Sequence, residues 1–261
     1  MIELLVTIIG LVIGSFLNVC IYRIPHGESI AFPPSHCTEC GQRLAASDLI
    51  PVVSYVLLRG RCRYCKTNIP IRYPLVELLT GMVFLLLYIR YGLSLSFAFY
   101  AIMMATMIVV FFIDLDHLII PDRLVVFASC LAGLTAIYNL FMPLTVYGDS
   151  IWWNPLLGAL IGSGSLLIVA IIGSIIFRTD EAMGGGDIKL MIPIGLFLGW
   201  RLTIVTLFLA IIIAGLVGIF LLLLKKTSRG SSIPFGPFIV LATFIALMWG
   251  YQIIEWYLAI Y

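Results

Sequence analysis

The sequence predicts an all-α polytopic membrane protein with about eight transmembrane helices. Hydrophobic residues make up 62% of its 261 residues and charged residues only 11%, whereas a soluble domain carries about 25% charged residues. The mean hydropathy is +1.15, and apolar runs near the length that spans a bilayer recur along the chain. These runs lack the polar alternation that the strands of a membrane barrel require. The net charge of +2 is too small to indicate a nucleic-acid partner.

Eight apolar segments are expected to cross or enter the lipid bilayer. The first carries Glu3, follows no basic region and has no small-residue cleavage site, so it is interpreted as a true span and not a signal peptide. The sixth is short and contains Pro193, which predicts a position deep in the bundle or a start below the membrane surface. The segments occupy residues 2–21, 74–89, 95–113, 124–142, 155–177, 188–200, 202–224 and 236–258.

The basic residues predict how the chain is oriented. With eight spans, the connections alternate between two sides, and thirteen of the fifteen basic residues fall on one side. The other side has only Arg90 and Arg201. The positive-inside rule makes the first side cytoplasmic and places both termini outside. The cytoplasmic set is Arg23, Arg43, Arg59, Arg61, Arg63, Lys66, Arg72, Arg123, Arg178, Lys189, Lys225, Lys226 and Arg229.

The longest polar stretch, residues 22–73, contains two CxxC pairs. Cys37 and Cys40 form the first pair, and Cys62 and Cys65 form the second after 21 intervening residues. This spacing predicts a four-cysteine zinc site, which is structural because no coordination position stays open for water. Two disulfides are the alternative, but the predicted cytoplasmic side is reducing. The other cysteines, Cys20 and Cys130, lie in spans and are expected to be packing residues.

Two acidic motifs lie at the cytoplasmic ends of spans. "FFIDLDHLIIPD" supplies Asp114, Asp116 and Asp122, and "MGGGDIKL" supplies Asp187 at the start of the sixth segment. Two spans separate the motifs, so both fall on the same face. Two carboxyl groups held close share one proton, which is the arrangement of an aspartyl protease. Asp114 adjoins an apolar run and is expected to be buried, whereas Asp116 is expected to be solvated.

The residues around Asp187 support a catalytic role but leave alternatives open. Gly184, Gly185 and Gly186 have no side chains, so a substrate backbone can approach closely. Asp187 could instead cap a helix with Lys189 as a surface partner, although residues two apart on a helix do not face each other. Asp122 follows a proline and is expected to be a helix N-cap. Polar caps or an ion pathway are as compatible with these residues as a catalytic pair.

Five motifs in order resemble the type IV prepilin peptidases, which are GxGD-type aspartyl proteases of the membrane. The resemblance covers nearly the whole chain and departs from the family in a longer connection at residues 143–155. It is carried by "GSFLNVCIYRIP" at 14–25, the CxxC pairs, "RYPLVELLTG" at 72–81, the two acidic motifs, and "PFGP" at 234–237.

The resemblance implies an activity and its residues. Such an enzyme removes the basic leader from type IV prepilins and secretion pseudopilins, and bifunctional members then methylate the new N-terminus with S-adenosylmethionine. The catalytic aspartates correspond to Asp114 and Asp187, with Gly184–Gly186 and Lys189 as active-site support. Glu77 lies near the cysteine loop and could contact a substrate amine, or it could make a polar contact within the bundle.

The resemblance also implies a location and a domain organisation. The protein is expected in the bacterial inner membrane, with the zinc loop and active site on the cytoplasmic side. Residues 1–21 form the first helix, 22–73 the four-cysteine domain and 74–261 a seven-helix protease domain. The alternatives are a GxGD protease of other membrane helices without methyltransferase activity, or an ion-coupled transporter that uses the aspartates.

Overall fold

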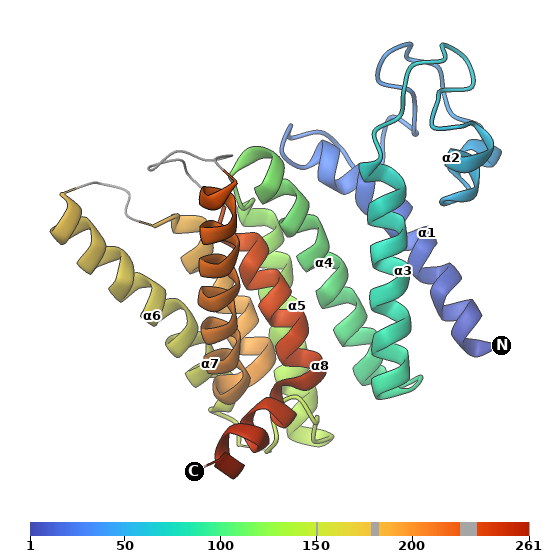
Figure 1. The fold of residues 1–261 in the computed structure, drawn as a ribbon. Coiled ribbons are helices and arrows are strands. Elements are labelled where there is room, and N and C mark those ends of the chain that lie inside the picture. The colour runs from blue at the N-terminus through green and yellow to red at the C-terminus, as the bar shows by residue number, and fades with distance from the viewer. Residues whose placement is uncertain (150, 179–182, 225–233, 261) are drawn as a thin grey trace. The chain divides into compact units, whose positions relative to one another are not determined.

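A computed structural model of the chain describes residues 1–149, 151–178, 183–224 and 234–260 (Figure 1). Within these ranges the chain is helical, and it has isolated bridges but no strand. Seven of the described helices are long and apolar enough to cross a membrane. The predicted all-α polytopic class is therefore confirmed. Lys225, Lys226 and Arg229, which entered the orientation prediction, lie outside the described residues.

The helix bounds follow the apolar runs of the sequence. In chain order they are α1 (Ile2–Arg23), the 3₁₀ helix η1 (Ala46–Leu49), α2 (Val53–Leu57), α3 (Arg72–Tyr91), α4 (Leu95–His117), α5 (Asp122–Phe141), α6 (Asn154–Phe177), α7 (Gly185–Leu223) and α8 (Gly236–Ile260). By packing, the chain divides into two compact units, Met1–Ile113 and Asp114–Tyr261, with the boundary inside α4.

In the first unit, glycines let α1 and α3 approach closely. A Cβ atom at Gly10 would lie 2.8 Å from the Cα of Gly81, and one at Gly14 would lie 2.7 Å from the Cα of Glu77. Small residues four apart allow such contacts because helices in lipid associate through close packing and polar bonds. Asn18 adds a polar bond, since its Nδ2 donates to the carbonyl of Tyr73 at 3.0 Å.

In the second unit, α7 is two helical segments that meet at Gly199. Gly199 has φ 72° and ψ 171°, which no helix contains. Gly158 of α6 faces the backbone of Gly195 and Gly199, and Gly162 one turn later faces both Met191 and Thr203. A single residue can contact positions on both sides of Gly199 only if the chain turns back there, and Figure 1 shows both ends of α7 at the same end of the unit. The predicted sixth and seventh segments are therefore both present.

The connection between α5 and α6 packs against this reversal. Asn154 at the start of α6 accepts a hydrogen bond from the Trp200 backbone N–H at 3.1 Å and donates to the Tyr147 carbonyl at 3.0 Å. Asp149 accepts from Asn154 at 2.7 Å and pairs with Arg201 at 2.8 Å. The connection between α5 and α6 thus holds the turn of α7.

Candidate active site and metal centre

Two matching turns present the four cysteines. In the first, the Cys37 N–H donates to the Gln42 carbonyl at 2.9 Å; in the second, the Cys62 N–H donates to the Thr67 carbonyl at 2.8 Å. The turns close through a left-handed residue at the same place, Gly41 at φ 68° and Lys66 at φ 63°. The two CxxC motifs are therefore copies of one local structure.

The four thiol groups converge on one point. The sulfur atoms of Cys37, Cys40, Cys62 and Cys65 all lie within 4.8 Å of one another, and Cys37 Sγ lies 3.8 Å from Cys65 Sγ. Four sulfurs about 2.3 Å from one zinc ion form a tetrahedron with edges of about 3.8 Å, whereas a disulfide needs about 2.0 Å. All six cysteines are free. The group can hold a metal ion, and the disulfide alternative does not fit it.

Neighbouring groups make the thiols unequal. Hydrogen bonds from the hydroxyl and backbone of Thr67 lower the pKa of Cys65 to about 6. At Cys40 a backbone hydrogen bond from Gln42 favours the thiolate, but burial and the other cysteines outweigh it and raise the pKa to about 11. Without a cation, the four sulfurs cannot all be thiolates at neutral pH, and a divalent metal supplies the missing charge.

Asp114 and Asp187 are both buried at helix ends within the second unit. Asp114 lies in the last turn of α4 and is 5% exposed, and Asp187 lies in the first turn of α7 and is 8% exposed. The two carboxyl groups are close enough to interact electrostatically. Oδ2 of Asp114 is buried and accepts no hydrogen bond from the described part of the chain. Asp116 is exposed, as predicted.

Ile120 and Gly236 complete the surroundings of the pair. A Cβ atom at Gly186 would lie 3.1 Å from Ile120 Cβ, and one at Gly236 would lie 2.5 Å from Asp114 Oδ2 and 3.3 Å from Ile120 Cδ1. Ile120 therefore lies between the starts of α7 and α8. Gly236 belongs to the PFGP motif, but no sequence signal identifies Ile120, because its role depends on which segments meet in the fold.

The three glycines before Asp187 differ in their surroundings. A Cβ atom at Gly184 would lie 2.8 Å from Asp187 Oδ2, so the carboxyl group folds back over the helix start. A Cβ atom at Gly185 would meet no described atom within 4 Å. Gly184 and Gly186 are thus needed for packing, whereas Gly185 borders open space beside the pair.

The remaining polar residues have separate partners. Lys189 Nζ pairs with Asp122 Oδ1 at 2.9 Å, and both side chains are exposed, so Lys189 is not the partner of Asp187. The expectation that Asp122 caps a helix is wrong, because α5 begins at Asp122 itself and Pro121 holds the cap position. Glu77 is buried in the first unit, where its Oε2 accepts the Val52 N–H at 2.7 Å.

Comparisons with known proteins agree with these arrangements. A family model described as the type IV leader peptidase family matches residues 101–219, and one described as the bacterial peptidase A24 N-terminal domain matches residues 8–91. No solved structure matches the chain.

Curated relatives named prepilin leader peptidase/N-methyltransferase match most of the chain. The one from Pseudomonas putida is 33% identical over 95% of this chain and 91% of its own length. The one from Bacillus subtilis is 34% identical over 96% of both chains, and the one from Myxococcus xanthus is 38% identical over 83% of this chain and 62% of its own. With the buried aspartates and the cysteine cluster, these matches establish that the chain belongs to the type IV leader peptidase family.

Proposed function

We propose that this protein cleaves the basic leader from type IV prepilins and pseudopilins and then methylates the new N-terminus. The observation that carries the peptidase assignment is the pair of buried carboxyl groups, Asp114 and Asp187, beside the open space at Gly185. The name of the relatives, prepilin leader peptidase/N-methyltransferase, supports both the substrate class and the second reaction.

The carboxyl pair suits general acid–base hydrolysis. Two carboxyl groups this close hold one proton between them more readily than they lose both. The ionised member removes a proton from water, the resulting hydroxide attacks the peptide carbonyl carbon, and the neutral member donates its proton to the carbonyl oxygen. The tetrahedral intermediate collapses when a proton reaches the leaving nitrogen, and the pair returns to its starting state. The buried Oδ2 of Asp114, which accepts no hydrogen bond from the described chain, is available for these transfers.

The position of the pair supports a substrate cut near the membrane surface. Asp114 lies three residues before the end of α4, and Asp187 is the third residue of α7. An ion-coupled transporter would place such groups near the membrane midplane. We assign this surface and the cysteine loop to the cytoplasmic side of the inner membrane, because the basic residues predict that orientation. Residues 74–261 would then form the protease domain, with 1–21 and 22–73 as the first helix and the metal-binding domain.

Zinc is the metal we propose for the cysteine cluster. Four thiolates whose sulfurs all lie within 4.8 Å of one another suit a closed tetrahedral site that stabilises the loop. S-adenosylmethionine is the proposed methyl donor. Glu77 remains a candidate contact for the substrate amine, although in the structure its carboxylate receives the Val52 N–H.

The deciding experiment is mass spectrometry of a pilin-type substrate incubated with the purified full chain and S-adenosylmethionine. Loss of the leader together with one added methyl mass is the expected result. Loss of the leader alone would reject the methyltransferase assignment. No cleavage by the folded protein would reject the prepilin peptidase, and other membrane helices would then be tested as substrates.

A further inference from the structure

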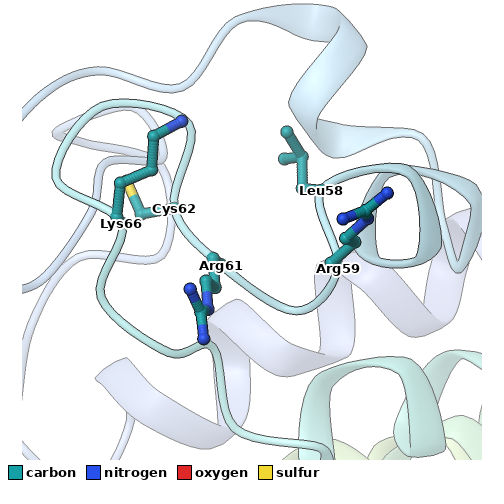
Figure 2. Close-up of a pocket in the computed structure, with 5 residues that line it drawn as sticks. All are labelled: Leu58, Arg59, Arg61, Cys62 and Lys66. Atoms are coloured by element: carbon teal, nitrogen blue, oxygen red, sulfur yellow. The ribbon is translucent and has the colours of Figure 1, made fainter.

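The loop that carries the second cysteine pair also forms a cationic cavity. The cavity measures about 340 Å³, and Figure 2 shows the five side chains that line it, Leu58, Arg59, Arg61, Cys62 and Lys66. The two arginines and the lysine form no ion pair with any residue that the structure describes. By contrast, the nearby Arg63 pairs with Asp48 at 2.7 Å. Figure 2 shows the charged ends of these side chains pointing in different directions from one loop. Three unpaired cations gathered on one loop make its surface positive and attract anions.

Backbone hydrogen bonds order the turn that carries these cations. The N–H groups of Gly60 and Arg61 donate to the carbonyls of Tyr55 and Leu58 at 2.8 and 3.1 Å. Arg59 and Lys66 adopt left-handed conformations, with φ 53° and 63°, which favour glycine over a long side chain. Strained backbone positions cluster at functional sites, and here two of them carry cationic side chains.

The charge of the cavity discriminates among candidate ligands. A basic leader peptide would be repelled. S-adenosylmethionine carries a sulfonium and an ammonium group against one carboxylate, so its net charge is positive and three cations disfavour it. A phosphate group suits the site, because arginine binds two of its oxygens at once and lysine adds a point charge.

The neighbouring helix α2 indicates where that phosphate comes from. Val53, Val56 and Leu57 on α2 are 50%, 66% and 76% exposed. The Val52 N–H is bound to Glu77, five residues into the spanning helix α3, which corresponds to about 7.5 Å along its axis at 1.5 Å per residue. Interfacial helices bury their apolar face about 5–10 Å into the boundary between headgroups and acyl chains. With the start of α3 at Arg72 taken as the membrane surface, the exposed apolar side chains of α2 fall at the depth of that boundary.

We propose that α2 is an interfacial membrane anchor and that the cavity formed by Arg59, Arg61 and Lys66 binds the phosphate of an anionic lipid headgroup. Apolar side chains of α2 enter the acyl boundary, and the cations behind it reach the headgroup layer. The lipid would hold the cysteine loop against the membrane surface. This site is separate from the aspartate pair and does not depend on the proposed peptidase activity.

Native mass spectrometry of the full chain in detergent, with added phosphatidylglycerol or phosphatidylcholine, tests the cavity. The wild type should retain phosphatidylglycerol preferentially. Arg59→Gln with Arg61→Gln should weaken that retention at least about tenfold, since basic residues contribute strongly at an anionic surface. Arg43→Gln is the matched control, because Arg43 is exposed on the other cysteine turn, outside the cavity. It should change retention by less than about twofold.

Three outcomes would overturn the assignment. Equal retention by the wild type and the double variant would exclude the cavity as the lipid site. Displacement of the lipid by S-adenosylmethionine would assign the cavity to the methyl donor. Tight binding of inorganic phosphate that excludes lipid would identify a site for a soluble anion. Circular dichroism should show the same helix content for all variants, so that a loss of binding reports the cavity and not unfolding.

Fluorescence quenching tests the anchor independently. In Val56→Trp, the added tryptophan should be quenched by brominated lipids in nanodiscs, after subtraction of the wild-type signal. Glu28→Trp serves as the control because Glu28 is exposed in the loop before the cysteines, and aqueous iodide should quench it instead. Quenching of Val56→Trp by iodide alone would show that α2 lies in water and would overturn the anchor.

Discussion

Asp114 and Asp187 are buried, whereas Asp116, two residues from Asp114 on the same helix, is exposed. Residues two apart on a helix point in different directions, so the DLD motif places one carboxyl group in the bundle and the other in solvent. A buried carboxyl group without a full set of hydrogen bonds destabilises the fold. The burial of two such groups near each other supports their proposed role in catalysis.

Replacement of either buried aspartate by asparagine should abolish leader cleavage. Asparagine keeps the size of the side chain but neither gains nor loses a proton, so a fall in kcat of at least about 10²–10⁴-fold is expected. Asp116→Asn is the matched control and should keep most of the activity. Cleavage is measured by mass spectrometry with each variant reconstituted at equal folded concentration. Substantial turnover by Asp187→Asn would contradict the mechanism.

Gly184 and Gly185 allow the same substitution at adjacent positions with different consequences. Gly184→Ala places a Cβ atom 2.8 Å from Asp187 Oδ2, so the carboxyl group must move and kcat should fall. Gly185→Ala meets no described atom, so kcat should be retained and any loss should be a higher KM. Steady-state kinetics with a pilin-type substrate separates the two. Full kcat in Gly184→Ala would show that the carboxyl position is not critical.

At the scale of the helices, the Asn154 side chain caps the reversal of α7. Gly199 breaks the helix, which frees the Trp200 N–H, and Asn154 accepts it. Asn154→Ala should lower the stability by about 1–3 kcal/mol, because the buried Tyr147 carbonyl and the partly buried Trp200 N–H lose their partner. Thermal unfolding in detergent measures this. Asn68→Ala, the same change at an exposed loop position, should leave the midpoint unchanged; an equal shift in both variants would refute the role of Asn154.

The same network predicts a dependence on pH. Burial raises the pKa of Asp149, but hydrogen bonds from Asn154, the Ile151 N–H and Arg201 outweigh it, so the pKa lies below its ordinary value of 3.8. A carboxyl group whose pKa is lowered by folding stabilises the folded state at pH values above its ordinary pKa. This stabilisation is lost as the pH falls through the pKa of the folded state. On acidification below about pH 4, the unfolding midpoint should fall more steeply for the wild type than for Asp149→Asn. Parallel curves would contradict this contribution.

The helices and the cysteine cluster could be predicted from local sequence, but several contacts could not. Apolar runs define spans because each helix must bury its backbone in lipid, and CxxC spacing defines a metal turn on its own. Asn154 lies 46 residues from Trp200, and Ile120 meets Gly186 and Gly236 from separate helices. Such positions acquire their role only when distant segments pack, so no periodicity or motif identifies them. The proline before Asp122 predicts a cap at that residue, yet its carboxylate pairs with Lys189.

For the whole molecule, the two compact units carry different chemistry. The cysteine cluster and Glu77 belong to the first unit, and the aspartate pair belongs to the second. The first family match, residues 8–91, ends with α3. The second, residues 101–219, begins inside α4. The helices of each unit pack against one another: α1 packs against α3 in the first unit, and α7 packs against α5, α6 and α8 in the second. Damage to one unit is therefore expected to spare the reaction of the other.

Removal of the cysteine ligands tests this separation. From residue 24 to residue 71 only Cys62 is buried, so the loop has almost no core, and we expect its folded form to depend on a bound metal. Cys37→Ser combined with Cys62→Ser should abolish metal binding, measured by elemental analysis, and should abolish methylation. Leader cleavage should remain within several-fold of the wild type, because Asp114 and Asp187 lie in the other unit.

Cys130→Ser is the control for the chemical change itself, since Cys130 is exposed and outside the cluster. It should retain the metal and both reactions. If the double variant loses cleavage together with methylation, the metal loop must support the aspartate pair, and the two units act as one enzyme. If it keeps methylation without metal, the cysteine loop is not needed for that reaction. Only the loss of methylation with cleavage intact fits a metal that stabilises one unit of a two-unit enzyme.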